Sequence, residues 1–288
     1  MASSSTTAIS SDVGLLGKLK ALYRRRETVQ FLVVSNLKAG HRDKLLGHLW
    51  SLLDPLLFAG VYFVVFGFIF RMTSRGRGAD FMIYLVVGVF AWKFMEGAVM
   101  QATTCIRGRR GLLHEINFPK GVLPVSICLS RLYDFLWGQV AAIAIILILG
   151  KSISLQIAWL PLIIFLQLLF TLGLAFMVSY LGAFFADTEN IVNVGMRLWF
   201  FMSPLFYYVD DVVKDGEVIA KAHIPEAYRA IFMLNPMAGF LGAYRDSLLY
   251  HTAPDQMELL YLVTVSIVFF VVGFAMFVRG EGSFAKYV

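Results

Sequence analysis

The sequence predicts an all-α integral membrane protein with six transmembrane helices, an amino-terminal amphipathic helix at the membrane interface and an outer re-entrant helical hairpin. Of its 288 residues, 59% are hydrophobic and only 15% are charged, whereas soluble proteins carry about 25% charged residues. The mean hydropathy is +0.73. So few charged side chains cannot cover a folded surface in water, and long uncharged runs point to a bilayer instead.

The amino-terminal 49 residues precede the first long apolar run. Residues 1–11 are rich in serine and threonine, so we expect them to be disordered. Residues 12–49 are predicted to be a cytoplasmic interface segment, because Leu15, Leu19, Leu22 and Tyr23 repeat at helical spacing beside lysines and arginines. The next apolar stretch, 29–37, is also too short to span. The alternative for this segment is a helix buried in a soluble domain.

Six apolar runs are long enough to cross the hydrocarbon core, which takes about 20 residues in a helix. Glycine, proline and acidic residues separate them, as expected for turns. The runs cover residues 50–70, 81–103, 122–149, 155–185, 190–209 and 259–279.

Lysine and arginine in the loops favour a cytoplasmic location for both chain ends. On that orientation the inner segments hold 8 such residues before Trp50, 4 in 104–121 and 2 in the carboxy-terminal tail, against 8 in the outer loops. The first outer loop, 71–80, runs against the bias because it carries three arginines.

The segment 228–252 is predicted to be the re-entrant hairpin on the outer side. Residues 231–244 are apolar, but Asn235-Pro236 interrupts them and the run is too short to cross. Broken backbone at membrane depth needs shelter from protein or a water-filled cavity. The alternative is a soluble loop that contains some apolar residues.

Catalytic, metal and redox motifs are missing from the sequence. Cys105 and Cys128 have neither a CxxC pattern nor clustered histidines, which excludes the common zinc and redox spacings and makes a disulfide unexpected. Gly150-Lys151-Ser152 looks like the end of a phosphate-binding loop, but Ile145 stands where the first glycine belongs. We therefore expect no catalytic residue, metal or cofactor on this chain. Its net charge of +6 suits membrane phosphates rather than nucleic acid.

Four motifs resemble the permease subunits of ABC exporters that move lipid-linked polysaccharides. Gly47, Trp50 and Pro55 lead into the first span, and Asn117-Phe118-Pro119-Lys120 precedes the third. Phe201-Met202-Ser203-Pro204-Leu205-Phe206-Tyr207 closes the fifth, and Asn235-Pro236 is followed by Ala243-Tyr244-Arg245. Order and spacing agree over nearly the whole chain. The departure is at 38–44, where Gly40-His41-Arg42 stands in a stretch in which the family often carries Arg-Tyr.

The resemblance implies a homodimer of this chain with two copies of a separate ATPase, which would bind ATP and magnesium, in the bacterial inner membrane. It also implies a cargo of polysaccharide on a polyprenyl diphosphate, O-antigen first, with teichoic acid or capsule as alternatives. Two other interpretations are a permease for drugs or small lipids and a membrane-embedded glycosyltransferase or acyltransferase. For the enzyme, Asp210-Asp211 is the one adjacent acidic pair in the sequence.

Two sets of residues are candidate functional groups of such a permease. The loop 104–121 either docks on the ATPase or only sets topology through its charged residues, which are Arg107, Arg109, Arg110, His114 and Glu115. Aromatic residues of the first and fifth spans either line a glycan path, since sugar rings stack on aromatic faces, or face lipid and the membrane interface. These are Tyr62, Phe63, Phe66, Trp199, Phe206 and Tyr207.

Charged residues within the spans form a third set, because charge inside a membrane is costly and usually functional or paired. Arg131 and Arg197 are candidate ligands of the lipid diphosphate, which suits a planar guanidinium. Arg131 with Asp134, and Lys93 with Glu96, stand at i, i+3 spacing and can instead pair with each other. Arg197 can instead reach lipid phosphates at the membrane surface.

Overall fold

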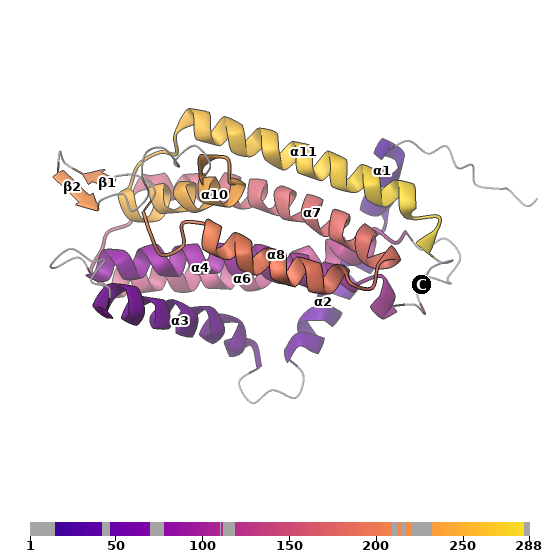
Figure 1. Cartoon of the computed structure of the whole chain (residues 1–288), viewed down its shortest axis with the longest axis horizontal. Helices are drawn as coiled ribbons and strands as arrows, with labels where there is room; N and C mark the ends of the chain where they lie inside the picture. Colours follow the sequence, from indigo (N-terminus) through magenta and orange to yellow (C-terminus); the bar gives the residue numbers. More distant parts are fainter. Residues whose placement is uncertain are drawn as a thin grey trace, which may run out of the picture.

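The computed structural model describes residues 15–41, 47–69, 78–109, 111, 119–208, 212–214, 217–220 and 232–284. Within them the chain forms an elongated bundle of helices (Figure 1). Its α-helices are α1 (Leu15–Arg24), α2 (Arg26–His41), α3 (Trp50–Tyr62), α4 (Gly78–Thr103), α6 (Val122–Ile148), α7 (Leu160–Phe184), α8 (Thr188–Met202), α10 (Pro236–Arg245) and α11 (Gln256–Gly280). Short 3-10 turns cover Gly47–Leu49, Arg107–Arg109 and Leu155–Trp159, and π-helical turns cover Phe63–Ile69 and Asp246–Tyr250.

Five helical stretches in the described part of the chain are long and apolar enough to cross a membrane. They are Trp50–Ile69, Gly78–Thr103, Val122–Ile148, Leu155–Phe184 and Gln256–Gly280, and they match five of the six predicted runs. The run 190–209 differs, because its helix α8 has only 15 residues, or about 22 Å at about 1.5 Å per residue. It ends at Ser203-Pro204, where the backbone becomes extended. Helix length therefore supports five of the six predicted spans.

Both ends of the described chain lie at one end of the bundle, which we call the termini end (Figure 1). Lys18 on α1 pairs with Glu281 just after α11, with 2.7 Å between Nζ and Oε2. Lys120, just before α6, donates its backbone N–H to the same carboxylate at 3.0 Å. At the opposite end Lys151 pairs with Asp80 at 2.6 Å. Both ends of the described chain therefore lie at the same end of the bundle, as the predicted cytoplasmic location of both termini requires.

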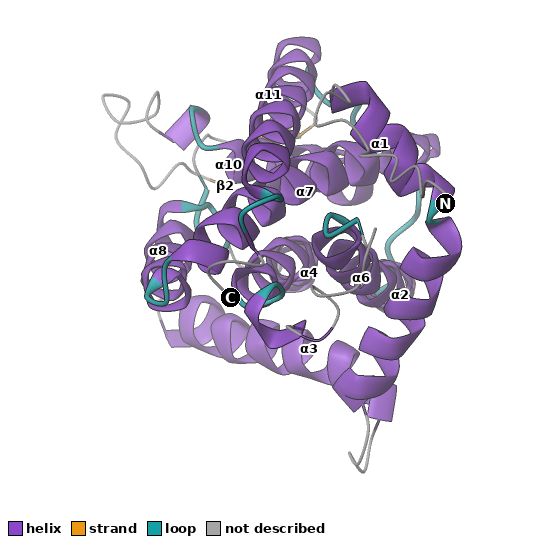
Figure 2. Ribbon diagram, turned by 90° about the vertical axis from the view of Figure 1, so that its right-hand side faces the viewer, coloured by secondary structure: helices purple, strands orange, loops and turns teal. Residues whose placement is uncertain are grey.

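Helix α4 is the centre of the bundle (Figure 2). It packs against α3, α6, α7, α8 and α10, so most of its length is buried. Gln167 of α7 donates to the backbone oxygen of Ala91 in α4 and accepts from the Tyr244 hydroxyl, both at 2.8 Å. A buried amide with its hydrogen bonds satisfied suits membrane depth, where water is not available to it.

Helix α10 occupies part of the predicted re-entrant hairpin. Its side chains Met237, Phe240, Leu241 and Tyr244 are fully buried, and it packs against α4, α7 and α11. This packing disfavours a soluble loop for α10, whereas residues 228–231 of the predicted hairpin lie outside the described residues. Between α8 and α10 stands a short antiparallel hairpin of β1 (Val212–Lys214) and β2 (Glu217–Ala220), which the sequence did not predict.

Two of the four sequence motifs meet at the end of α8, namely the one that closes the fifth run and the one that starts with Asn235-Pro236. Asn235 caps α10 by accepting from the backbone N–H of Met237, and it also accepts from the Trp199 indole N–H at 2.7 Å. Its amide donates to the hydroxyl of Ser203 at 3.0 Å. Asparagine supplies both an acceptor and a donor, so this one side chain holds the broken end of α8 against the start of α10.

The amino-terminal helices lie along the outside of the bundle at the termini end (Figures 1 and 2). On α2, Val29 and Leu32 are buried, and the helix packs against α6. Phe31 of the same helix is 73% exposed and Tyr23 of α1 is 70% exposed. Large exposed apolar side chains beside a basic helix agree with the predicted interface position, while α2 is also anchored to the bundle.

Candidate functional site

A large cavity lies between α2, α3, α4 and α6. Its volume is about 1040 Å³, at the upper limit of the range usual for small-molecule sites, roughly 300–1,000 Å³. Lys93 stands ten residues before the end of α4 and Arg131 nine residues after the start of α6, so each lies about 15 Å inside the termini end at about 1.5 Å per residue. The cavity therefore occupies the half of the bundle nearer the two chain ends.

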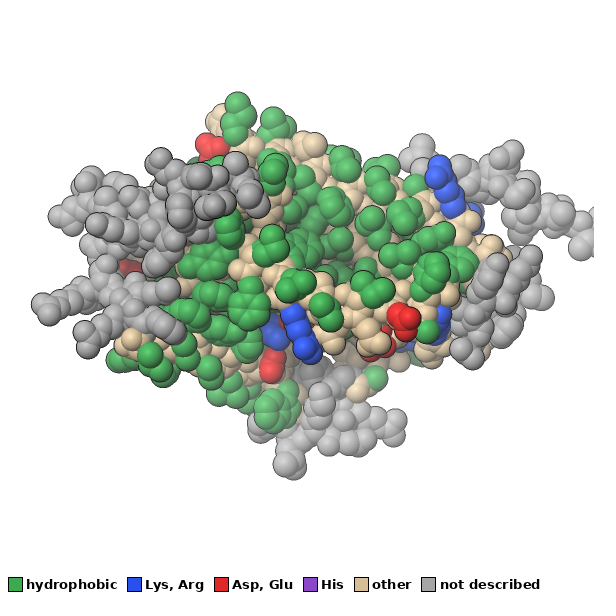
Figure 3. All heavy atoms as spheres, in the orientation of Figure 1, with side chains coloured by type: hydrophobic (Ala, Val, Ile, Leu, Met, Phe, Trp, Pro, Cys, Tyr) green, Lys and Arg blue, Asp and Glu red, His purple; other side chains and the backbone are tan. Residues whose placement is uncertain are grey.

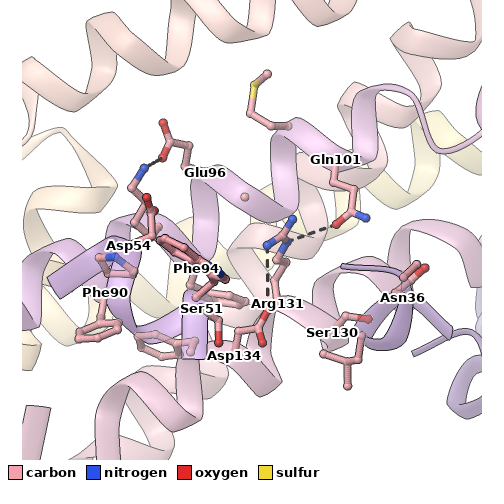
Figure 4. Close-up of a pocket in the computed structure, with 18 of the residues that line it drawn as sticks. Asn36, Ser51, Asp54, Phe90, Phe94, Glu96, Gln101, Ser130, Arg131 and Asp134 are labelled. Carbon is pink, nitrogen blue, oxygen red and sulfur yellow. Dashed lines mark hydrogen bonds and ion pairs between the residues drawn. The ribbon is translucent and has the colours of Figure 1, made fainter. Parts of the chain in front are cut away.

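Ionic and polar side chains line much of this cavity (Figure 4). Lys93 pairs with Glu96 at 3.2 Å and Arg131 with Asp134 at 4.0 Å, which confirms the predicted i, i+3 pairs. Arg131 also donates through Nε to Gln101 at 3.2 Å. Gly97 lies beneath this guanidinium, since a Cβ there would stand 3.4 Å from Nε. The lining residues are Asn36, Leu37, Ala39, Trp50, Ser51, Asp54, Pro55, Phe90, Lys93, Phe94, Glu96, Gly97, Met100, Gln101, Arg109, Ser130, Arg131, Asp134 and Phe135.

The motif before the first span builds one wall of the cavity. Gly47 has a φ of +47°, in the left-handed region that glycine enters without strain, and it starts the turn into α3. Trp50 and Pro55 then line the cavity together with Asp54. Sequence reasoning identified this motif by resemblance alone and passed over Asp54. The available signal was a carboxylate within a long apolar run.

Arg109 points into the bundle. Its Nη2 donates to Oδ1 of Asn36 on α2, and Asn36 in turn donates to Ser126 of α6 at 3.5 Å. The Nη1 atom is buried and finds no hydrogen-bond partner among the described residues. Of the other residues predicted to contact an ATPase, Arg107 is partly exposed, whereas Arg110, His114 and Glu115 lie outside the described side chains.

Three of the six predicted aromatic residues form a stack between α3 and the segment after α8. Phe66 and Phe206 have ring centroids 4.5 Å apart, Tyr62 and Phe206 5.5 Å, and Tyr62 and Phe66 5.7 Å, with the planes within 14° of one another. We call Tyr62, Phe66 and Phe206 the aromatic stack. Phe58 and Phe200, which belong to the same two apolar runs, pack against the Tyr62 ring at 4.7 and 5.9 Å.

The other three predicted aromatic residues lie outside the parallel stack, although the Tyr207 ring stands edge-on to Phe206 at 5.3 Å. Trp199 stands edge-on to Trp92 and donates to Asn235, so it belongs to the packing of α8 against the bundle. Phe63 packs against Phe81. The hydroxyl of Tyr207 donates to the backbone oxygen of Phe201 at 3.1 Å.

The two arginines predicted to bind a diphosphate have different surroundings. Arg131 lines the cavity, whereas Arg197 is exposed on α8 and is not among the cavity residues. Figure 3 shows hydrophobic side chains over the face formed by α3, α8 and α11, with a group of basic and acidic side chains between α3 and α8. The structure therefore places Arg131 in the lining of the cavity and Arg197 on the exposed surface of α8.

Two groups at the termini end have shifted pKa values. Burial raises the pKa of the Cys105 thiol to about 11. Burial also lowers the pKa of Lys120, an effect that Glu281 opposes and Lys18 reinforces. Both cysteines are buried free thiols. In the described part of the chain, no group of three or more His, Cys, Asp or Glu side chains is arranged to hold a metal ion.

Comparison with known proteins places these features in a family. The family model described as "ABC-2 type transporter" matches residues 27–249, which include the cavity and the aromatic stack. This chain belongs to the ABC-2 type transporter family. It is a multi-pass permease component of the membrane, with the apolar helices that such a role requires.

Relatives of this ABC-2 permease match it over almost its full length. The "O-antigen export system permease protein RfbA" of Myxococcus xanthus is 28% identical over 93% of this chain and 98% of the relative. The protein of the same name from Klebsiella pneumoniae is 28% identical over 88% of this chain and 93% of the relative. The "Polysialic acid transport protein KpsM" of Escherichia coli is 19% identical over 88% and 93%.

Proposed function

We propose that this ABC-2 permease exports a polysaccharide linked to a polyprenyl diphosphate, most closely of the O-antigen class, across the bacterial inner membrane. The observation that carries the proposal is the cavity, because it presents paired cations and carboxylates at membrane depth in the half of the bundle nearer the chain ends. A drug permease would instead offer a closed apolar pocket. The relatives named for O-antigen export support the same cargo class.

The experiment is deletion of the gene in the organism that carries it, with complementation by the intact gene. The proposal expects surface polysaccharide to disappear while its polyprenyl-diphosphate-linked form accumulates in the inner membrane. Mass spectrometry of the accumulated glycan identifies the cargo. Unchanged surface glycan, together with altered drug susceptibility or lipid composition, would refute polysaccharide export.

Capsule export is the second candidate function, and the similarity to a protein named for polysialic acid transport favours it. Teichoic acid export rests on the family resemblance alone. The accumulated glycan separates the three cargo classes, because a repeating O-antigen unit, an acidic capsule polymer and a polyol phosphate differ in mass and composition. The acidic pair Asp210-Asp211, which an enzyme interpretation would use, lies outside the described residues.

The orientation we propose places the termini end in the cytoplasm, with six crossings. Two chain ends on one side require an even number of crossings, and α8 starts beside the end of α7 while α11 starts at the opposite end of the bundle (Figure 1). Helix α8 with residues 203–208 then makes the sixth. A fluorescent-protein fusion at the carboxyl end and alkaline phosphatase fusions after residues 151 and 186 test this topology, with phosphatase activity expected only after 151.

Energy for export would come from a separate ATPase that binds ATP and magnesium, in an assembly of two permease and two ATPase chains. Support comes from the family and from Arg107, which stays partly exposed at the termini end. Reversal of charge at Arg107 and Arg110 is expected to reduce co-purification of the ATPase. If the ATPase co-purified and export proceeded at the level of the unmodified chain, the loop would be a topology signal only.

A further inference from the structure

The Arg109 guanidinium has a hydrogen-bond donor that the described part of the chain does not satisfy. Its Nη2 donates to Asn36, whereas Nη1 is buried and has no hydrogen-bond partner among the described residues. The Arg109 side chain is also among those that line the cavity. A buried charged donor left without an acceptor is unfavourable, and native proteins keep few of them. An acceptor that enters the cavity would satisfy it once the guanidinium turns towards the cavity.

The cavity offers charged, amide and aromatic side chains to a ligand (Figure 4). Arg131 lies beside Asp134, with Gln101, Ser130 and Asn36 towards one end of the cavity. Glu96, which pairs with Lys93, lies at the other end with Asp54 and the Phe90 and Phe94 rings. Guanidinium groups bind phosphate oxygens in a planar, often bidentate manner. Carboxylates accept hydrogen bonds from hydroxyls, and aromatic rings pack against sugar faces. A sugar joined to phosphate carries groups that these side chains can bind.

Arg109 also connects the cavity to two elements outside it. It ends the turn Arg107–Arg109, which follows α4 and opens the segment predicted to contact an ATPase. Through Asn36 it holds α2, and Asn36 continues the connection to Ser126 of α6. A ligand that binds Nη1 would therefore contact a side chain that already joins the 107–109 turn to α2.

We propose that Arg109 binds a phosphate of the cargo head in this cavity and thereby couples cargo binding to the position of the 107–109 turn. The proposal rests on the proposed function, since it takes the cargo to be a prenyl diphosphate. Arg131 binds the phosphate from α6, and Arg109 binds it from the turn. An occupied cavity holds the turn against α2, and an associated ATPase is stimulated in consequence.

The binding test uses the full-length chain in nanodiscs with farnesyl diphosphate as the probe. Arg109→Gln and Arg131→Gln are each expected to weaken probe binding about tenfold to hundredfold, which corresponds to a hydrogen bond to a charged group. Lys38→Gln is the matched control, because Lys38 is exposed on α2 two residues from Asn36. Farnesol tests whether the prenyl chain alone binds, and inorganic pyrophosphate tests whether the free anion alone binds. Both are expected to bind far more weakly than farnesyl diphosphate.

The coupling test uses a matched pair at Asn36 in the complex with the ATPase. Asn36→Leu removes the acceptor for Arg109 but leaves both arginines, so probe binding is expected to persist while stimulation of ATP hydrolysis by the probe is lost. Asn36→Asp keeps an acceptor and is expected to keep the stimulation. Arg109→Lys is a second variant in case Arg109→Gln misfolds. Its ammonium group keeps the positive charge but cannot donate to Asn36 and to the phosphate in the planar geometry of a guanidinium.

Several results would overturn this inference. Wild-type affinity in both Arg109 variants, equal binding of pyrophosphate and farnesyl diphosphate, or full stimulation in Asn36→Leu would each do so. If any of these appeared while gene deletion still abolished surface glycan, polysaccharide export would stand and only the role of Arg109 would fall. If one of these results appeared and gene deletion also left surface glycan unchanged, the proposed function itself would be rejected.

Discussion

Gly182 of α7 is in direct contact with the end of α4, and its replacement by alanine tests the packing on which the cavity depends. A Cβ at this position would lie 1.9 Å from the backbone oxygen of Thr103, the last residue of α4. The hydroxyl of Ser179 also donates to the backbone oxygen of Ala102 at 3.0 Å. Because Arg109 follows a few residues later, any shift of this end of α4 also moves the cavity wall.

The expected cost follows from that distance. Contacts of a real Cβ essentially never fall below 3.0 Å, so the two helices would have to separate by about 1 Å. Overpacking of this kind costs about 1–3 kcal/mol, and a weakened Ser179 hydrogen bond adds about 0.5–1.5 kcal/mol. Gly195→Ala in α8 is the control, because nothing lies within 4 Å of its Cβ. Both variants gain the same helix propensity, about 1 kcal/mol, so Gly182→Ala is expected to be about 2–4 kcal/mol less stable than Gly195→Ala.

The chain supplies its own probe for the assay. Cys105 and Cys128 are the two cysteines of the sequence, and both are buried, so a thiol-reactive fluorophore reports unfolding as temperature rises in detergent. Gly182→Ala is expected to release fluorescence several degrees below Gly195→Ala. A midpoint equal to or above that of the control would show that α4 and α7 are not in contact at Thr103, and the position of the cavity would then be wrong.

Three further predictions follow from the same contacts. Alanine at all three positions of the aromatic stack is expected to slow glycan export, measured as surface polysaccharide over time, while membrane levels of the protein stay unchanged; lowered levels would indicate a packing role instead. At pH 7 the Cys105 thiol, with its pKa near 11, has only about one thiolate in 10,000, so maleimide should not label the folded chain. The pKa of this thiol is higher in the folded than in the unfolded chain. The stability that the thiol contributes is therefore present below about pH 9 and is lost as the pH rises towards 11. Cys105→Ala should remove that part of the loss of stability at alkaline pH. Asn235→Ala is expected to lower unfolding stability by about 2–4 kcal/mol, because the helix cap is lost and the Trp199 indole is left without its acceptor, whereas Asn235→Asp, which keeps the acceptor, should lose less.

Local rules predicted the long helices well. A helix must carry about 20 apolar residues to cross hydrocarbon, and this requirement can be read from composition alone. The pairs Lys93–Glu96 and Arg131–Asp134 were predictable for a similar reason, since spacing along one helix sets their distance. The short α8 was not predictable from hydropathy, because its apolar run continues past Ser203. The break there is stabilised by Asn235, which lies 32 residues further along the chain.

The cavity was beyond sequence reasoning because four helices distant in the chain build it. From the sequence, Arg109 was a candidate either for docking on the ATPase or for setting topology. In the folded chain the turn after α4 directs this side chain towards Asn36, 73 residues earlier. Trp199 was a candidate for a glycan path or for the membrane interface, and in the folded chain its indole N–H donates to Asn235. In each case a partner far away in sequence decides where the side chain points.

The charged cavity and the aromatic stack are joined through a single helix. The first turns of α3 line the cavity with Trp50 and Pro55, and its last turns carry Tyr62 and lead to Phe66. Between them the Lys93 ammonium lies 4.9 Å from the Phe58 ring, and Phe58 contacts Tyr62 at 4.7 Å. The helix ends in a π-helical turn, a geometry often found at functional sites, and it is the least buried of the five long spans. A movement of α3 would therefore change both sites together.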